Sequence, residues 1–99
     1  MPHRRTGPRK TQICGISALW TDEEGTVTRL AGLVEERSRY GVSICVPEPI
    51  EIGTKVKIRG RVRELQGTVR HCRYTAGEYF IGIQLDQEDP NWDRFGAGL

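Results

Sequence analysis

Hydrophobic and polar residues alternate along several short stretches of the chain, a pattern typical of half-buried β-strands. The clearest alternation covers residues 41–46, where Val42, Ile44 and Val46 share one face. A second covers residues 55–59, where two apolar side chains lie between outward-facing Lys55, Lys57 and Arg59. The pattern therefore predicts two short strands with one face toward a core.

Four further runs are rich in β-branched and aromatic residues and are bounded by turn residues. They cover residues 13–20, 26–35, 62–74 and 79–85, and the turns between them include "DEEG", "PEP" and "TAGE". Gly32 indicates a bulge in the second run, and Gly67 indicates a bend in the third. The 12 glycines and 5 prolines interrupt every long helical pattern, so we expect no long helix.

Six strands at short spacing predict an all-β fold, either a closed six-stranded antiparallel β-barrel or a sandwich. The barrel is favoured because closure removes the open edges through which small sheets aggregate. We expect a flexible basic arm over residues 1–12, the barrel over residues 13–86 and a short C-terminal tail over residues 87–99. Trp92 and Phe95 in the tail are spaced to pack on the barrel from one helical turn.

The 99 residues suffice for one domain with a small core. We find neither a bilayer-spanning apolar run nor a secretory signal, so a cytoplasmic location is expected. Cys14, Cys45 and Cys72 are an odd, widely spaced set. This favours free thiols, and neither a metal nor another cofactor is expected. A metal site that adds His71 to the three cysteines is the alternative.

The net charge of +2 is too small for a general nucleic-acid binder, but the charge is unevenly distributed. Residues 1–10 contain Arg4, Arg5, Arg9 and Lys10 and no acid, whereas the charged residues within 86–99 are four acids and one arginine. A local cationic segment indicates a local anionic partner. The cations of residues 55–63, including Arg61 and Arg63, are interpreted as a solvated face of the barrel.

Two short motifs contain residues that are suited to binding an anion. Arg5 and Arg9 stand four apart around a Gly-Pro pair that prevents a helix, and "ERSRYG" at residues 36–41 is expected to form a bend between strands. Guanidinium groups pair with phosphate oxygens and guanine edges, and a glycine permits close approach of a ligand. The two motifs therefore predict an anion-binding clamp. A solubilising tail and ordinary turn chemistry are the alternative interpretations.

Together these motifs resemble those of PilZ domains. The segment from Arg5 to Arg9 matches RxxxR, and the segment from Glu36 to Gly41 matches (D/N)xSxxG except that Glu36 replaces the Asp or Asn. The "PxPxxxG" loop at residues 47–53 and the closing "FIGIQL" are also similar, and the resemblance extends over roughly residues 4–85. It implies a six-stranded antiparallel barrel that binds the bacterial second messenger cyclic di-GMP.

The resemblance also implies roles for single residues. Arg5 and Arg9 would bond phosphate and the Hoogsteen edge of guanine, and Ser38 and Gly41 would line the barrel side. The whole predicted ligand-binding set is Arg4, Arg5, Arg9, Glu36, Arg37, Ser38 and Gly41.

No catalytic residues are expected, since adjacent His71 and Cys72 would point to opposite faces of a strand. The prediction is a non-enzymatic receptor for cyclic di-GMP that signals to an unidentified effector protein. A degenerate PilZ-like barrel that binds protein without nucleotide is the alternative. A monomer and a dimer are both compatible with the sequence, and the ligand enters as one molecule or as a stacked pair.

Overall fold

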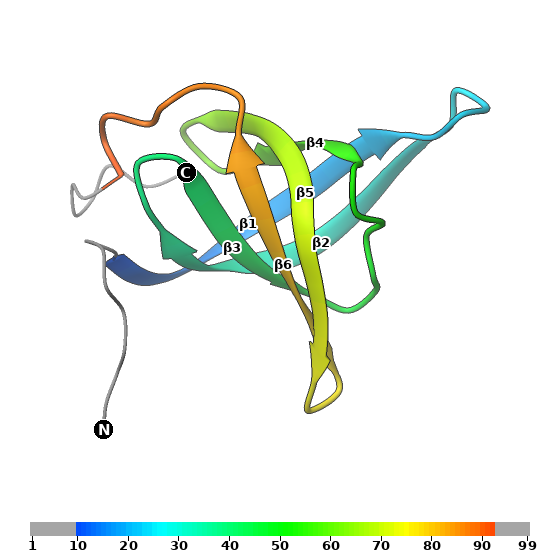
Figure 1. The fold of residues 1–99 in the computed structure, drawn as a ribbon, viewed down its shortest axis with the longest axis horizontal. Helices are drawn as coiled ribbons and strands as arrows, with labels where there is room; N and C mark the ends of the chain where they lie inside the picture. Colours follow the sequence, from blue (N-terminus) through cyan, green and yellow to red (C-terminus); the bar gives the residue numbers. More distant parts are fainter. Residues whose placement is uncertain (1–9, 93–99) are drawn as a thin grey trace.

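Six antiparallel strands form one closed barrel (Figure 1). The computed structural model describes residues 10–92. The strands are β1 (Lys10–Thr21), β2 (Val27–Arg37), β3 (Gly41–Val46), β4 (Lys55–Arg59), β5 (Glu64–Thr75) and β6 (Glu78–Leu85). Their order around the barrel is β1-β2-β3-β6-β5-β4, and β4 closes it by pairing with β1. The predicted all-β, six-stranded antiparallel barrel is confirmed. Over residues 10–92, no helix is long and apolar enough to cross a membrane.

The core lies inside the barrel and follows the alternation in the sequence. The inward positions of β3 and β4 are buried aliphatic residues, as are those of the other strands. Because burying apolar surface contributes about 25 cal/mol per Å², these side chains provide the main stabilisation. The core side chains are Ile16, Ala18, Leu30, Val34, Val42, Ile44, Val46, Ile50, Val56, Ile58, Val69, Ile81, Ile83 and Leu85.

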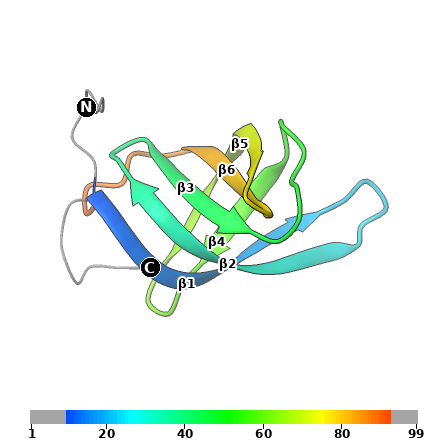
Figure 2. The same cartoon turned by 90° about the horizontal axis from the view of Figure 1, so that it is seen from below.

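Strand bounds agree with the sequence pattern for β3 and β4 and differ most at the start of β1. β1 begins at Lys10, three residues earlier than expected. β2 continues to Arg37, so Glu36 and Arg37 belong to the strand and only residues 38–40 form the bend. The β1–β2 and β5–β6 hairpins extend beyond the barrel in different directions (Figure 1, Figure 2).

Two glycines allow close approach between strands. A Cβ atom added at Gly32 would lie 2.6 Å from the carbonyl oxygen of Cys45, and one added at Gly67 would lie 2.3 Å from that of Gln84. The expected bulge at Gly32 is wrong, because the register shift of β2 lies between Val34 and Glu36. Gly32 is required for packing against β3.

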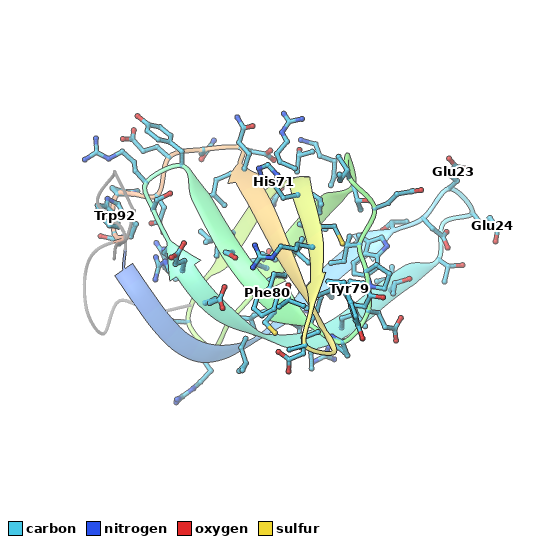
Figure 3. The ribbon with its side chains drawn as sticks, turned by 60° about the horizontal axis from the view of Figure 1, so that its bottom comes forward. Glu23, Glu24, His71, Tyr79, Phe80 and Trp92 are labelled. Carbon is cyan, nitrogen blue, oxygen red and sulfur yellow. The ribbon has the colours of Figure 1, made fainter. Side chains whose placement is uncertain are left out.

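Residues 86–92, which we call the C-terminal segment, fold back onto the end of the barrel where β2 and β3 join (Figure 3). The amide of Asp89 donates to the carbonyl of Arg39 at 2.8 Å. Asp89 is only 2% exposed, and Trp92 is also buried. The expected packing of Trp92 on the barrel therefore fits, while Phe95 lies outside the described residues.

Candidate functional site

A groove of about 630 Å³ lies on the outer face of the barrel, across β2, β3, β6 and β5. Its volume is in the range of small-molecule sites, about 300–1,000 Å³. Glu36, Ser38 and Gly41 of the second motif line the groove. Tyr40, between them in sequence, also lines it and is 62% exposed.

One row of cross-strand neighbours forms the floor of the groove. Glu36 pairs with Ser43, Ser43 pairs with Gly82, and Gly82 pairs with His71. Cross-strand neighbours project from the same face of a sheet, so these four positions all face outward. The two central residues are small, but the His71 side chain lies against Gly82, where an added Cβ atom would be 3.1 Å from Cδ2 of His71. The row, which we call the floor row, is therefore lowest at Ser43.

Two register shifts bring Glu36 and His71 into the floor row. One lies in β2 between Val34 and Glu36, and the other lies in β5 between Val69 and His71. Because successive side chains of a strand alternate between faces, an extra residue reverses which of the following ones face outward. Without the shift in β2, Glu36 would face inward, as Val34 does. Arg37 would then face solvent.

The bend of the second motif is closed by backbone contacts. The amide of Ser38 donates to the carbonyl of Gly41 at 2.9 Å. A Cβ atom added at Gly41 would lie 3.2 Å from the carbonyl oxygen of Ile83 and 3.6 Å from the hydroxyl oxygen of Ser38. The absence of a side chain at Gly41 therefore lets β3 lie close to β6 and leaves room beside the Ser38 hydroxyl.

Arg37 lies at the end of the barrel, where its side chain is 1% exposed. Its Nη2 donates to Oδ2 of Asp89, and Nη2 of Arg63 donates to Oδ1 of the same carboxylate at 2.9 Å. The expectation that Arg63 belongs to a solvated face is wrong, because its side chain is largely buried in this cluster. Arg37 and Arg63 thus connect the C-terminal segment to two parts of the barrel.

The carboxyl group of Asp89 is held in its charged form. Burial alone would raise its pKa, but the hydrogen bonds from Arg37 and Arg63 outweigh burial and lower the pKa below its ordinary value of 3.8. The backbone amide of Asn91 also donates to Asp89 and acts in the same direction. The cluster therefore joins two guanidinium groups to one charged carboxylate.

Outward-facing side chains of β5 form the wall of the groove opposite the second motif. Nε of Arg70 donates to Oε1 of Gln84 at 2.9 Å. The guanidinium carbon of Arg73 lies 5.2 Å from the ring centre of Phe80, on the neighbouring strand. We call Arg70, His71 and Arg73 the β5 wall; His71 and Phe80 are labelled in Figure 3.

Sequence reasoning missed the β5 wall as part of the site. The "RHCR" stretch of residues 70–73 offered a signal, since it is rich in cations on a predicted strand. Cys72 in this stretch packs against the core while His71 faces the groove, which confirms that these two neighbours point to opposite faces.

Cys45 lies on the same outer face, in the row beside the floor row. Its thiol donates to Oε1 of Glu78 at 2.8 Å. Burial and this hydrogen bond raise the pKa of the Cys45 thiol from 9.0 to about 11. Over residues 10–92, no group of three or more His, Cys, Asp or Glu side chains is arranged to hold a metal ion.

The Cys45 thiol is expected to react slowly with iodoacetamide at pH 8. A rise in pKa from 9.0 to about 11 lowers the fraction of reactive thiolate by about a hundredfold. Mass spectrometry of single peptides gives the rate for Cys45. Glu78→Gln should accelerate alkylation of Cys45, because it removes the negative charge that opposes ionisation. An unchanged rate would contradict the role of Glu78.

The first motif is related to the groove through the start of β1. Lys10 pairs with Arg37 and Thr11 pairs with Glu36, so the chain enters the barrel beside the second motif. Arg4, Arg5 and Arg9 lie outside the described residues. In comparisons with known proteins, no family model matches the chain and no curated protein matches it. The candidate site is thus defined by the residues and geometry of this chain alone.

Proposed function

We propose that the protein is a non-catalytic cytoplasmic receptor that binds cyclic di-GMP in the groove, between Arg5 and Arg9 and the second motif. One observation carries the proposal: Glu36, Ser38 and Gly41 line a single groove of about 630 Å³ on the outer face of the barrel. The start of β1 beside the end of β2 supports it further, since it brings the chain that follows the first motif to the same rim.

The chemistry of the ligand suits these groups. Cyclic di-GMP has two phosphates and two guanines, and arginine pairs in a bidentate manner with phosphate oxygens and with guanine O6 and N7. Such an arginine–guanine pair contributes about 1–3 kcal/mol to discrimination between bases. The carboxylate of Glu36 accepts hydrogen bonds from guanine N–H groups, and the small side chain of its neighbour Ser43 gives a flat ring room to approach.

Signalling in this proposal requires a partner protein. Ordering of the N-terminal arm over the ligand would present a new surface only when the messenger is present. An unidentified effector protein would recognise that surface. Binding of the ligand is then the input of a switch, and no chemical step on the nucleotide is required.

Calorimetric titration of the full chain with cyclic di-GMP tests the proposal. We expect micromolar binding that is weakened at least about tenfold by Arg5→Ala or Arg9→Ala, since each removes a charge-assisted contact. Arg61→Ala is the matched control, because Arg61 is exposed in the β4–β5 connection and does not line the groove. The control should bind like the wild type.

Glu36→Asp, measured in the same titration, should tighten binding, because it restores the shorter acid of the motif that this chain resembles. Weaker binding would mean that the carboxylate of Glu36 reaches the ligand in a different arrangement. Absence of heat from folded wild-type protein would reject the proposed ligand.

The alternative function is a barrel that docks on a protein without nucleotide. A folded chain that fails to bind cyclic di-GMP would favour this alternative.

A further inference from the structure

We infer that the β5 wall is a second anion-binding half-site, which holds the far phosphate and purine of a two-nucleotide ligand. The inference rests on the proposed function and deepens it, because it assigns the far half of the ligand to Arg70, His71 and Arg73. The second motif on β2 and β3 then holds the near half.

The width of the groove supports a ligand with two nucleotide units. The floor row crosses four strands, from Glu36 on β2 to His71 on β5. Neighbouring strands lie about 4.8 Å apart, so the path along the curved surface from one end of the row to the other is about 14 Å. A ligand that contacts both ends must follow this path. Ser43 is the low point of the path, and the His71 side chain lies against Gly82 beside it.

The two arginines of the β5 wall are positioned by neutral neighbours, so their positive charge is not neutralised. Over residues 10–92, Arg37, Arg39, Arg59 and Arg63 form ion pairs with carboxylates, whereas the two wall arginines form none. Arg70 is bonded instead to the neutral side chain of Gln84. A positioned cation without a carboxylate partner is suited to an external anion.

Arg73 is positioned by two neutral groups. Its Nε donates to the hydroxyl of Thr75 at 3.3 Å, and its guanidinium group lies over the ring of Phe80. Guanidinium planes stack on aromatic rings and on purine bases, and their edges bond phosphate. The Arg73–Phe80 pair therefore offers a flat cationic surface for a purine, with Arg70 nearby on β5 for a phosphate.

The acids of the groove lie on the opposite side. Glu35 and Glu36 both line the groove from β2, whereas the β5 wall contributes only cationic and neutral groups. An anionic ligand would thus be drawn toward β5 by charge, while its guanine N–H donors would meet the carboxylates of β2. This polarity matches a ligand that has both phosphates and hydrogen-bond donors.

Titration of the full chain with cyclic di-GMP tests the half-site. Arg70→Gln and Arg73→Gln should each weaken binding about tenfold, since each removes a charge-assisted contact. Arg61→Gln makes the same change of charge away from the groove and should leave the affinity unchanged. Thermal unfolding of all three variants should resemble that of the wild type, because the replaced side chains are exposed. Wild-type affinity in both wall variants would overturn the inference while leaving the proposed function intact.

A second measurement separates the two claims when the nucleotide does not bind. If cyclic di-GMP leaves the NMR spectrum of the wild-type protein unchanged, the proposed function is rejected. The same sample is then titrated with inorganic pyrophosphate, and the Nε–H resonances of the arginines are followed. Shifts at Arg70 and Arg73 without a shift at Arg61 would support an anion site on the β5 wall. Equal shifts at all three, or none, would overturn it.

Discussion

Replacing Asp89 by alanine is expected to lower the free energy of unfolding by about 3–5 kcal/mol. The substitution removes the Asp89 carboxylate that pairs with the guanidinium group of Arg37, whose side chain is only 1% exposed. It also removes the acceptor of Arg63. Domains of this size are stable by only about 5–15 kcal/mol, so the loss is a large fraction of the total. Urea denaturation followed by circular dichroism measures it.

Asp86→Ala is the matched control for Asp89→Ala. Asp86 is three residues earlier and pairs with Lys55 at 3.1 Å, but both side chains are exposed. Exposed ion pairs contribute about 0–1 kcal/mol, so this variant should unfold almost like the wild type. Equal destabilisation by the two substitutions would contradict the buried position of the Asp89 carboxylate.

The contribution of Asp89 should also depend on pH. Its pKa in the folded chain is lowered below 3.8, so the folded state binds its proton less readily than the unfolded state. The stabilisation is therefore fully present above pH 3.8 and is lost as the pH falls through the lower, folded pKa. The difference in stability between the wild type and Asp89→Asn should shrink in this acidic range. A difference that grows there would contradict the assigned direction.

Replacing Gly67 by alanine is expected to cost about 3 kcal/mol, at the upper end of the usual range for overpacking. The added Cβ atom would lie 2.3 Å from the carbonyl oxygen of Gln84 and 2.7 Å from Cγ2 of Ile83. A backbone atom in a paired strand cannot move aside as a side chain can. β5 and β6 would have to separate locally. Hydrogen exchange measures this effect, because the most slowly exchanging amides of β6 should lose protection.

Gly15→Ala provides the control for Gly67→Ala. Gly15 also lies in a strand, but no atom lies within 4 Å of an added Cβ, and the residue is exposed. Because glycine is unfavourable within strands, this substitution should be neutral or stabilising by up to about 1 kcal/mol. Similar destabilisation at both positions would contradict the close approach of β5 and β6.

The sequence pattern predicted the fold well because strand alternation and turn residues are local signals. β4 has the bounds expected from its alternating residues, and β3 follows from the same signal. Closure was predicted from the number of strands and the cost of open edges. The bend expected within residues 36–41 lies at residues 38–40, and Glu36, Ser38 and Gly41 line the groove.

Other features depend on contacts between segments far apart in the chain. The shift in β2 between Val34 and Glu36 is determined by pairing with β3, and no residue type at that position indicates it. Arg37 and Asp89 are 52 positions apart, so their ion pair has no local signal. The β5 wall shares a groove with the second motif because β6 lies between β5 and β3. The sequence pattern alone did not indicate this strand order.

The extra residue in β2 lies just before the second motif and can be removed without changing the faces of the motif. Removing Glu35 would leave "RSRYG" unchanged and would join Val34 directly to Glu36. Regular alternation would then keep Val34 inward beside Ile44, Glu36 outward beside Ser43 and Arg37 inward beside Val42. The acidic rim and the cation that holds the C-terminal segment would stay in place, while the local bend that an extra residue produces would be lost. Searches for such receptors by motif letters should therefore accept strands of either length before the motif.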